Sequence, residues 1–185
     1  ASMNYTEFFN IRKTIRWGTN QGSREGKIDQ LIEQFFKCQS DSIEVDRHIS
    51  ADEVMIPCSG KNPFMVYIPT KPHSNGILLR AVGGMIQEGR RKRVFLVSGF
   101  LYDPRGHLTT TDMLMKMAEP YENTGRVLYT DRYYSSPTGC SLLLKKGLYL
   151  TGIVSPKRKG IPPPFQGKAN EISQGHAEAL YCHEE

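Results

Sequence analysis

Several features that would mark a specialised class of protein are missing from this sequence. In its 185 residues, no apolar run approaches the ~20 residues needed to span a bilayer, so we expect no membrane contact. No basic N-terminal stretch precedes an apolar segment, so no secretory signal is visible. Internal repeats and low-complexity tracts are also missing. With 38% hydrophobic and 23% charged residues, the composition is that of a globular domain with one hydrophobic core.

The cysteine pattern and the net charge bear on the cellular compartment and on the type of binding partner. The four cysteines stand at positions 38, 58, 140 and 182, and no pair has the Cys-x-x-Cys spacing of a zinc ribbon. These scattered positions also do not suggest a disulfide framework. The cysteine pattern therefore predicts a reducing compartment, the cytosol or the nucleus. The 24 basic and 19 acidic side chains give a net charge of +5. This small excess favours a polyanionic partner only weakly.

Both ends of the chain predict a piece of a longer protein. Ala1-Ser2-Met3 resembles residues left by a cloning vector ahead of native sequence. At the other end, Glu184-Glu185 stops without a terminating element. We therefore expect functional residues of the full protein to lie outside this sequence.

Hydrophobic periodicity predicts an α/β protein, because helical spacing and short β-rich runs alternate along the chain. The predicted elements are a helix within 5–21, an amphipathic helix around 28–36, strands at 49–57, 77–82 and 94–102 with a short extended piece at 64–68, a helix from Thr109, a strand at 126–130, a helix from Ser136 and a strand at 148–154. This order indicates a mixed sheet flanked by helices. The ribonuclease H-like fold has this order, and other α/β folds share parts of it. We divide the chain into an N-terminal helical segment (1–48), a core (49–165) and a tail (166–185).

Two aspartates stand where strands would present metal ligands. Asp52 lies within the first predicted strand, and Asp131 ends the strand at 126–130. If these strands are parallel neighbours, both carboxylates face one cleft, and a divalent cation would relieve their repulsion. Mg²⁺ accepts carboxylate oxygens, and water and phosphate complete its octahedron. On these residues alone, a turn-forming or helix-capping role for each aspartate stays open.

The segments around both aspartates carry a recognisable set of motifs. Around the first are Ser50-Ala51-Asp52-Glu53, Gly60-Lys61 and Tyr67-Ile68-Pro69-Thr70-Lys71-Pro72. Around and after the second are Thr130-Asp131-Arg132-Tyr133-Tyr134-Ser135-Ser136, Thr151-Gly152-Ile153-Val154 and Arg158-Lys159-Gly160-Ile161-Pro162. In order and spacing, these motifs resemble the piggyBac-type transposases and their domesticated relatives. The resemblance covers about residues 25–165.

This resemblance implies the ribonuclease H-like core of a DNA transposase, with Mg²⁺- or Mn²⁺-dependent strand cleavage and transfer. It implies Asp52 and Asp131 as two of three catalytic, metal-binding aspartates. The implied contacts to double-stranded DNA are Lys61, Lys71, Arg158 and Lys159. It also implies a nuclear protein that forms a homodimer at full length. No aspartate follows Asp131, so the third one is not in this sequence, and we expect this chain alone to be inactive.

Other functions stay open beside this one. Apolar residues replace the polar residues usual in the family at Met65, Leu78 and Val82. These replacements favour a domesticated, catalytically inactive module that binds DNA or another protein. A different ribonuclease H-like nuclease is the third alternative. A substitute third carboxylate at Glu171 is weighed against a solvated tail residue, which we favour.

Structural roles are predicted for the remaining notable residues. Glu53 alternates to the strand face opposite Asp52, so we expect it to form a salt bridge. Tyr133 and Tyr134 are expected to pack beneath the loop that carries Asp131. The run 90–93 is interpreted as a solvated hairpin turn, with contacts to phosphate and a nuclear localisation signal as the alternatives. The partial zinc set is treated as tail residues, and it consists of His176, Cys182 and His183.

Overall fold

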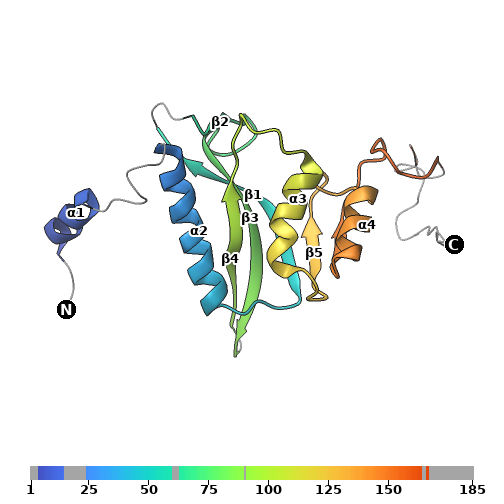
Figure 1. Cartoon of the computed structure of the whole chain (residues 1–185), viewed down its shortest axis with the longest axis horizontal. Helices are drawn as coiled ribbons and strands as arrows, with labels where there is room; N and C mark the ends of the chain where they lie inside the picture. The colour runs from blue at the N-terminus through green and yellow to red at the C-terminus, as the bar shows by residue number, and fades with distance from the viewer. Residues whose placement is uncertain (1–3, 15–23, 60–62, 90, 164–165, 167–185) are drawn as a thin grey trace. The chain divides into compact units, whose positions relative to one another are not determined.

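The computed structural model describes residues 4–14, 24–59, 63–89, 91–163 and 166 (Figure 1). In chain order its elements are α1 (Tyr5–Thr14), α2 (Arg24–Ser42), β1 (His48–Pro57), β2 (Met65–Tyr67), β3 (Asn75–Glu88), β4 (Arg91–Leu101), α3 (Thr110–Ala118), the 3₁₀ helix η1 (Glu119–Tyr121), β5 (Val127–Thr130), α4 (Pro137–Lys145) and β6 (Tyr149–Gly152). The predicted α/β succession is confirmed, and η1 is an addition to it. Within the described ranges, no helix has the length and hydropathy of a membrane span.

The sheet is mixed, as predicted. β2 and β4 each pair antiparallel with β3, whereas β1 pairs parallel with β5 and β5 pairs parallel with β6. A parallel pair needs a crossover connection, and α4 provides it between β5 and β6. β1 has β3 as its other neighbour, so it lies between the antiparallel strands β2–β4 and the parallel strands β5 and β6 in the order of the sheet.

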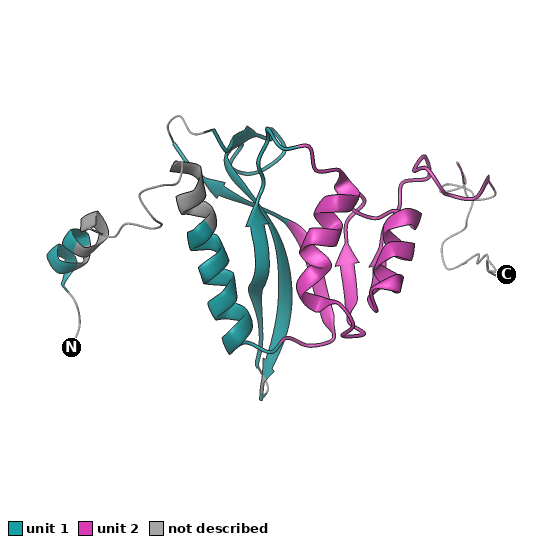
Figure 2. Ribbon diagram, in the orientation of Figure 1, with its two compact units in different colours: residues 1–44, 53–106 teal, residues 45–52, 107–185 magenta. Residues whose placement is uncertain are grey.

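Contacts divide the chain into two compact units, which Figure 2 shows in different colours. Unit 1 comprises residues 1–44 and 53–106, and unit 2 comprises residues 45–52 and 107–185. The predicted segments are divided along the chain, and the units are divided by contacts. The predicted N-terminal segment (1–48) contains α2, and contacts group this helix with β3 and β4 in unit 1. Of the predicted tail, only Gln166 lies within the described residues.

The core of unit 1 forms where α2 packs against the sheet. α2 contacts β4, and the ring of Phe36 is buried against Leu79 and Ala81 of β3. Side chains two residues apart share one face of a strand, so Leu79 and Ala81 face the helix together. Leu78 and Val82 belong to the opposite face of β3 and are also buried. β3 therefore has buried apolar residues on both faces.

In unit 2, the helices cover one side of the parallel strands. α4 packs against β6, and α3 packs against α4. Along β1 and β5, buried residues alternate with exposed ones: Ile49 and Leu128 are buried, whereas the adjoining Ser50 and Tyr129 are exposed. One face of these strands therefore belongs to the core, and the other carries exposed side chains.

Both later helices begin at the residues that the sequence predicts, and each start has a side-chain cap. Thr109 Oγ1 accepts a hydrogen bond from the Asp112 N–H (3.2 Å), and Asp112 Oδ2 accepts one from the Thr109 N–H (2.9 Å). The hydrogen bonds from the Thr109 hydroxyl and then from its N–H lower the pKa of Asp112 below its ordinary value. At α4, Ser136 Oγ accepts from the Gly139 N–H (3.0 Å), and Pro137 occupies the first helical turn.

Candidate active site

Asp52 and Asp131 each follow the last paired residue of two neighbouring parallel strands. The register of β1 and β5 ends with Ala51 opposite Thr130, and an aspartate is the next residue after each of these two. Adjacent strands in a sheet lie about 4.8 Å apart, so the pairing delivers both residues to the same edge. The parallel pairing on which the sequence argument depends is present, and the role of the two carboxylates as metal ligands stays a prediction.

A contact between side chains shows that β1 and β5 expose the same face. His48 Nδ1 lies 3.1 Å from the Tyr129 hydroxyl, within hydrogen-bonding distance. Both residues are exposed, and Asp52 is an exposed residue of β1 in alternation with His48 and Ser50. Asp131 follows Tyr129 by two positions and is exposed as well. The two aspartates therefore belong to the exposed side of the parallel strands.

The loop after β5 orients the Asp131 carboxylate. Its Oδ1 accepts hydrogen bonds from the Tyr133 N–H (2.9 Å) and the Tyr134 N–H (3.3 Å). An aspartate that bonds to the backbone two residues ahead forms an Asx turn. The turn-forming role that the sequence left open is thus present. Because Oδ1 makes both bonds, the turn orients the carboxylate without engaging both of its oxygens.

Buried hydroxyl groups support this loop from behind. Thr130 Oγ1 lies 2.7 Å from Ser135 Oγ, and Ser135 Oγ donates to the Asp131 carbonyl oxygen at 2.8 Å. Gly152 of β6 approaches so closely that a Cβ there would overlap Ser135 Oγ and the Thr130 carbonyl. Only glycine leaves room for the hydroxyl pair at this position.

The two tyrosines of the loop differ in their surroundings. Tyr134 is 1% exposed and packs in the core, as predicted, whereas Tyr133 is 45% exposed. Their rings meet edge to face, with centroids 5.0 Å apart. The packing role predicted for both residues therefore applies to Tyr134, and Tyr133 retains an accessible ring.

Arg158 contacts this loop in the structure, although the sequence assigns it to DNA. Its Nη2 donates to the carbonyl oxygens of Arg132 (2.9 Å) and Tyr133 (2.6 Å). Its neighbour Lys159 is exposed. No sequence motif indicates the Arg158 contacts, because their acceptors are backbone carbonyls, which every residue has.

Lys71 has an acidic partner in unit 1. Its Nζ lies 3.1 Å from Glu53 Oε1, and Arg80 Nη1 lies 3.2 Å from Glu53 Oε2. The salt bridge predicted for Glu53 is confirmed. Arg80 is buried, and its guanidinium also lies 4.9 Å from the ring centroid of Tyr102. Lys61, the other predicted DNA contact of this region, lies outside the described residues.

Two of the apolar replacements that favour an inactive module serve the core. Leu78 is 2% exposed and Val82 is 0% exposed, so packing accounts for their apolar character. They give no support to a loss of DNA contacts at those positions. Met65 is half-buried in β2.

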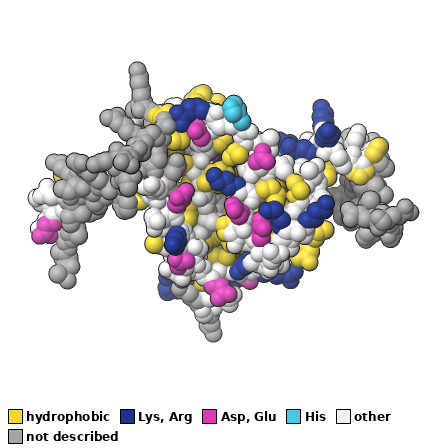
Figure 3. Space-filling model, in the orientation of Figure 1, with side chains coloured by type: hydrophobic (Ala, Val, Ile, Leu, Met, Phe, Trp, Pro, Cys, Tyr) yellow, Lys and Arg dark blue, Asp and Glu magenta, His cyan; other side chains and the backbone are white. Residues whose placement is uncertain are grey.

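The described part of the chain contains no ready-made cluster of metal-binding side chains. Among these residues, no group of three or more His, Cys, Asp or Glu side chains is arranged to hold an ion. The four tail residues weighed as ligands, Glu171, His176, Cys182 and His183, lie outside the described ranges. On the face of the molecule drawn in Figure 3, basic and acidic side chains are interspersed, which agrees with the small net charge.

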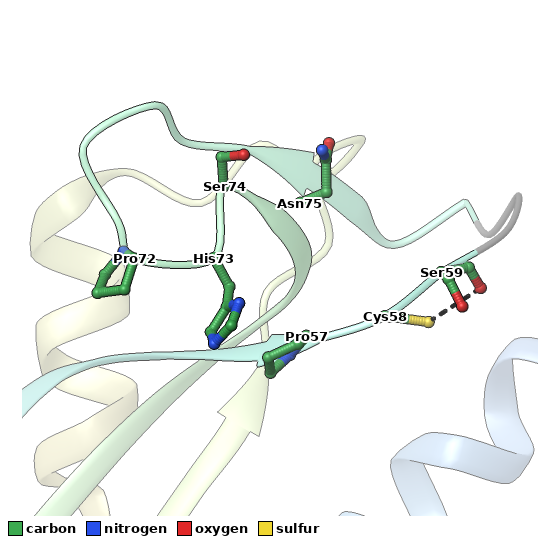
Figure 4. A pocket seen from close by; sticks show the side chains of 7 residues that line it. All are labelled: Pro57, Cys58, Ser59, Pro72, His73, Ser74 and Asn75. Carbon is green, nitrogen blue, oxygen red and sulfur yellow. Dashed lines mark hydrogen bonds between the residues drawn. The ribbon is translucent and has the colours of Figure 1, made fainter.

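A pocket of about 470 Å³ opens in unit 1 (Figure 4). Its walls come from the end of β1 and from the segment that leads into β3, and they are Pro57, Cys58, Ser59, Pro72, His73, Ser74 and Asn75. Apart from the imidazole of His73, this lining has no titratable nitrogen or carboxylate. It includes none of the predicted site residues, so we assign it no role in catalysis.

Comparison with known proteins gives one family and one similar structure. A sequence model of the family described as Transposase IS4 matches residues 2–184. The fold resembles that of a piggyBac transposase in a cryo-EM structure of its synaptic complex with hairpin DNA, with a TM-score of 0.71 and 19% sequence identity. The match covers 99% of this chain and 41% of that chain, so the present chain spans less than half of its length. No curated protein matches the sequence.

Proposed function

The chain belongs to the family described as Transposase IS4, and from this we propose that it is the main part of the catalytic core of a piggyBac-like DNA transposase. One observation carries the proposal: Asp52 and Asp131 directly follow the last paired residues of adjacent parallel strands. The resemblance implies a catalytic aspartate at each of these positions. The family match also favours a transposase over another class of ribonuclease H-like nuclease.

We assign the fold to the ribonuclease H-like class. In support, the antiparallel pair β3–β4 adjoins β1 through β3, and the parallel strands β5 and β6 follow on the other side of β1. The helices α3 and α4 come between the later strands in the chain. This is the strand succession from which the sequence predicts the class.

The two aspartates fit Mg²⁺ or Mn²⁺ as ligands. Mg²⁺ is commonly held by one or two carboxylates, with water and substrate phosphate in its other positions. When bound, such ions stabilise the attacking and leaving oxygens of a phosphodiester exchange. The backbone of this chain orients one of the two carboxylates, because the Tyr133 and Tyr134 N–H groups both donate to Asp131 Oδ1. Without a third aspartate, we expect weak binding and no cleavage by this chain alone.

We propose double-stranded DNA as the partner. Exposed cations support it, among them Lys159 and the hairpin residues Arg91, Lys92 and Arg93. Each neutralised phosphate releases counterions, so binding should be weak, independent of sequence and sensitive to salt. The nucleus is the matching compartment, and the homodimer of the full-length protein stays a prediction.

A titration with Mn²⁺, followed by nuclear magnetic resonance, tests the site. Because Mn²⁺ is paramagnetic, amide signals beside Asp52 and Asp131 should broaden at the lowest concentrations. Asp131→Asn should raise the Mn²⁺ concentration needed for this broadening about tenfold, because one of two charged ligands is lost. Asp41→Asn, at an exposed site on α2, is the control and should leave it unchanged. Broadening that begins elsewhere, or that persists in both Asp52→Asn and Asp131→Asn, would remove the active-site assignment.

A further inference from the structure

We propose that Arg158 is a positioning residue for Asp131. The sequence motif assigns Arg158 to a DNA phosphate, whereas the structure places its guanidinium on the loop that carries Asp131. The inference rests on the proposed role of Asp131 as a metal ligand. It extends that role by naming the group that holds the carboxylate in its orientation.

Arg158 and Asp131 bind opposite ends of the same two peptide groups. Arg158 Nη2 donates to the carbonyl oxygens of Arg132 and Tyr133. The N–H groups of these same peptide units belong to Tyr133 and Tyr134, and both donate to Asp131 Oδ1. Each peptide group therefore lies between a guanidinium at its oxygen and a carboxylate at its nitrogen.

This arrangement transmits orientation because a peptide group is planar and rigid. Fixing the carbonyl oxygen of a peptide also fixes the direction of its N–H. The two peptide dipoles point their negative ends at Arg158 and their positive ends at Asp131, so the hydrogen bonds polarise one another. Bonds to ionised groups are about twice as strong as neutral ones. Arg158 thus strengthens the bonds that hold Asp131 Oδ1.

The backbone holds Arg158 at this place without help from a ligand. The Arg158 N–H donates to the Ser155 carbonyl (2.9 Å), and the Ile161 N–H donates to the Arg158 carbonyl (3.2 Å). Gly160 has a φ of +90°, which favours glycine. A Cβ at Gly160 would lie 3.4 Å from Pro137 Cβ, so this turn packs on the start of α4. The turn and the Asp131 loop are therefore joined through the same part of unit 2.

Arginine suits this role better than lysine. One Nη2 carries two hydrogens in a fixed plane, and the structure uses that nitrogen for both carbonyls. An ammonium is a flexible point charge without this planar geometry. A phosphate contact would tolerate lysine, because the charge is retained, whereas a positioning contact depends on the geometry.

Amide hydrogen exchange of the whole chain tests the proposal. Arg158→Ala should speed exchange at the Tyr133 and Tyr134 amides by roughly tenfold, because their carboxylate partner loses its support. Arg158→Lys keeps the charge and should speed it by about threefold. Lys157→Ala removes the same charge one residue away, from an exposed side chain, and should leave both rates unchanged. A second readout is the Mn²⁺ affinity, which should fall in Arg158→Ala and stay unchanged in Lys157→Ala.

A role for Arg158 as a phosphate contact predicts different results in the same experiments. If Arg158→Ala leaves both exchange rates unchanged, the proposal is wrong. If it also flattens the slope of log K for DNA binding against log salt by about 0.9, Arg158 is a phosphate contact. If Arg158→Ala does not fold, Arg158→Lys decides, and exchange rates equal to those of the unaltered chain overturn the proposal. If Mn²⁺ does not bind the unaltered chain, the proposed function fails, but the exchange rates still test the positioning role.

Discussion

Glu53 Oε1 lies 3.1 Å from Lys71 Nζ, so the lysine that the motif assigns to a DNA phosphate already has an anionic partner. The Lys71 side chain is 29% exposed and that of Glu53 is 19% exposed. The ion pair is thus partly shielded from water and is screened less by salt than an exposed pair. The Glu53 carboxylate therefore competes with a DNA phosphate for the same ammonium. Lys71 should contribute less to DNA binding than an exposed lysine without such a partner.

The salt dependence of duplex binding separates these two kinds of lysine. Lys159→Ala should flatten the slope of log K against log salt by about 0.9, the contribution of one phosphate. Lys71→Ala should flatten it by less, because Glu53 already neutralises that charge. Fluorescence anisotropy with a labelled duplex measures both slopes, and Lys37→Ala on the exposed side of α2 serves as the control. A larger effect at Lys71 than at Lys159 would contradict this expectation.

The same ion pairs make Glu53 important for stability. Its second oxygen binds Arg80, whose side chain is only 6% exposed. Breaking a buried charge pair from one side costs about 3 kcal/mol, so Glu53→Gln should lower the free energy of unfolding by roughly that amount. Lys71→Ala should cost about 1 kcal/mol or less, because its ion pair is more exposed. Urea unfolding measures both losses, and equal losses would show that Arg80 does not depend on Glu53.

The local signals of the sequence were sufficient for most elements of the fold. The capping box at Thr109 and the Ser136-Pro137 start mark two helices correctly because cap chemistry depends on a few adjacent residues. The hairpin is longer than predicted, with β3 at Asn75–Glu88 and β4 at Arg91–Leu101. Two glycines and a basic run obscure the strand pattern there, yet the pairing continues to Glu88 opposite Arg91.

The candidate site was only partly open to sequence reasoning. Asp52 and Asp131 stand out because a family motif surrounds each one, and their strand register is a property that the structure adds. The contacts of Arg158 leave no trace in the sequence, because backbone carbonyls accept them. The burial of Leu78 and Val82 depends on packing against the face of β3 opposite Leu79 and Ala81, and the short apolar run at 77–82 does not by itself reveal this packing.

Gly152 should tolerate no side chain. A Cβ at this position would overlap Ser135 Oγ and the Thr130 carbonyl, and overpacking of a tight core costs about 1–3 kcal/mol. Gly152→Ala should therefore lower the free energy of unfolding by that amount and disturb the loop of Asp131. Thr151→Ala, at the preceding exposed position of β6, is the matched control. Chemical denaturation compares the two variants, and an equal effect would mean that the hydroxyl pair moves aside without cost.

The stability of α3 should depend on pH through Asp112. Hydrogen bonds from Thr109 lower the pKa of the Asp112 carboxyl in the folded state, so the folded chain binds this proton less readily than the unfolded chain does. The resulting stabilisation is complete above the pKa of an unstructured aspartate, about 3.9. It is lost as the pH falls through the lower folded pKa.

Thermal unfolding of the unaltered chain and of Asp112→Asn, followed between about pH 2.5 and pH 7, measures this contribution. The unaltered chain should melt at the higher temperature near neutral pH, because only the ionised carboxylate gains from both Thr109 bonds. The difference should shrink below about pH 4. Asp103 also has a lowered pKa, through its hydrogen bonds with Arg105, and it is intact in both proteins, so its effect cancels in the comparison. A difference that grows on acidification would show that Asp112 caps the helix in its protonated form.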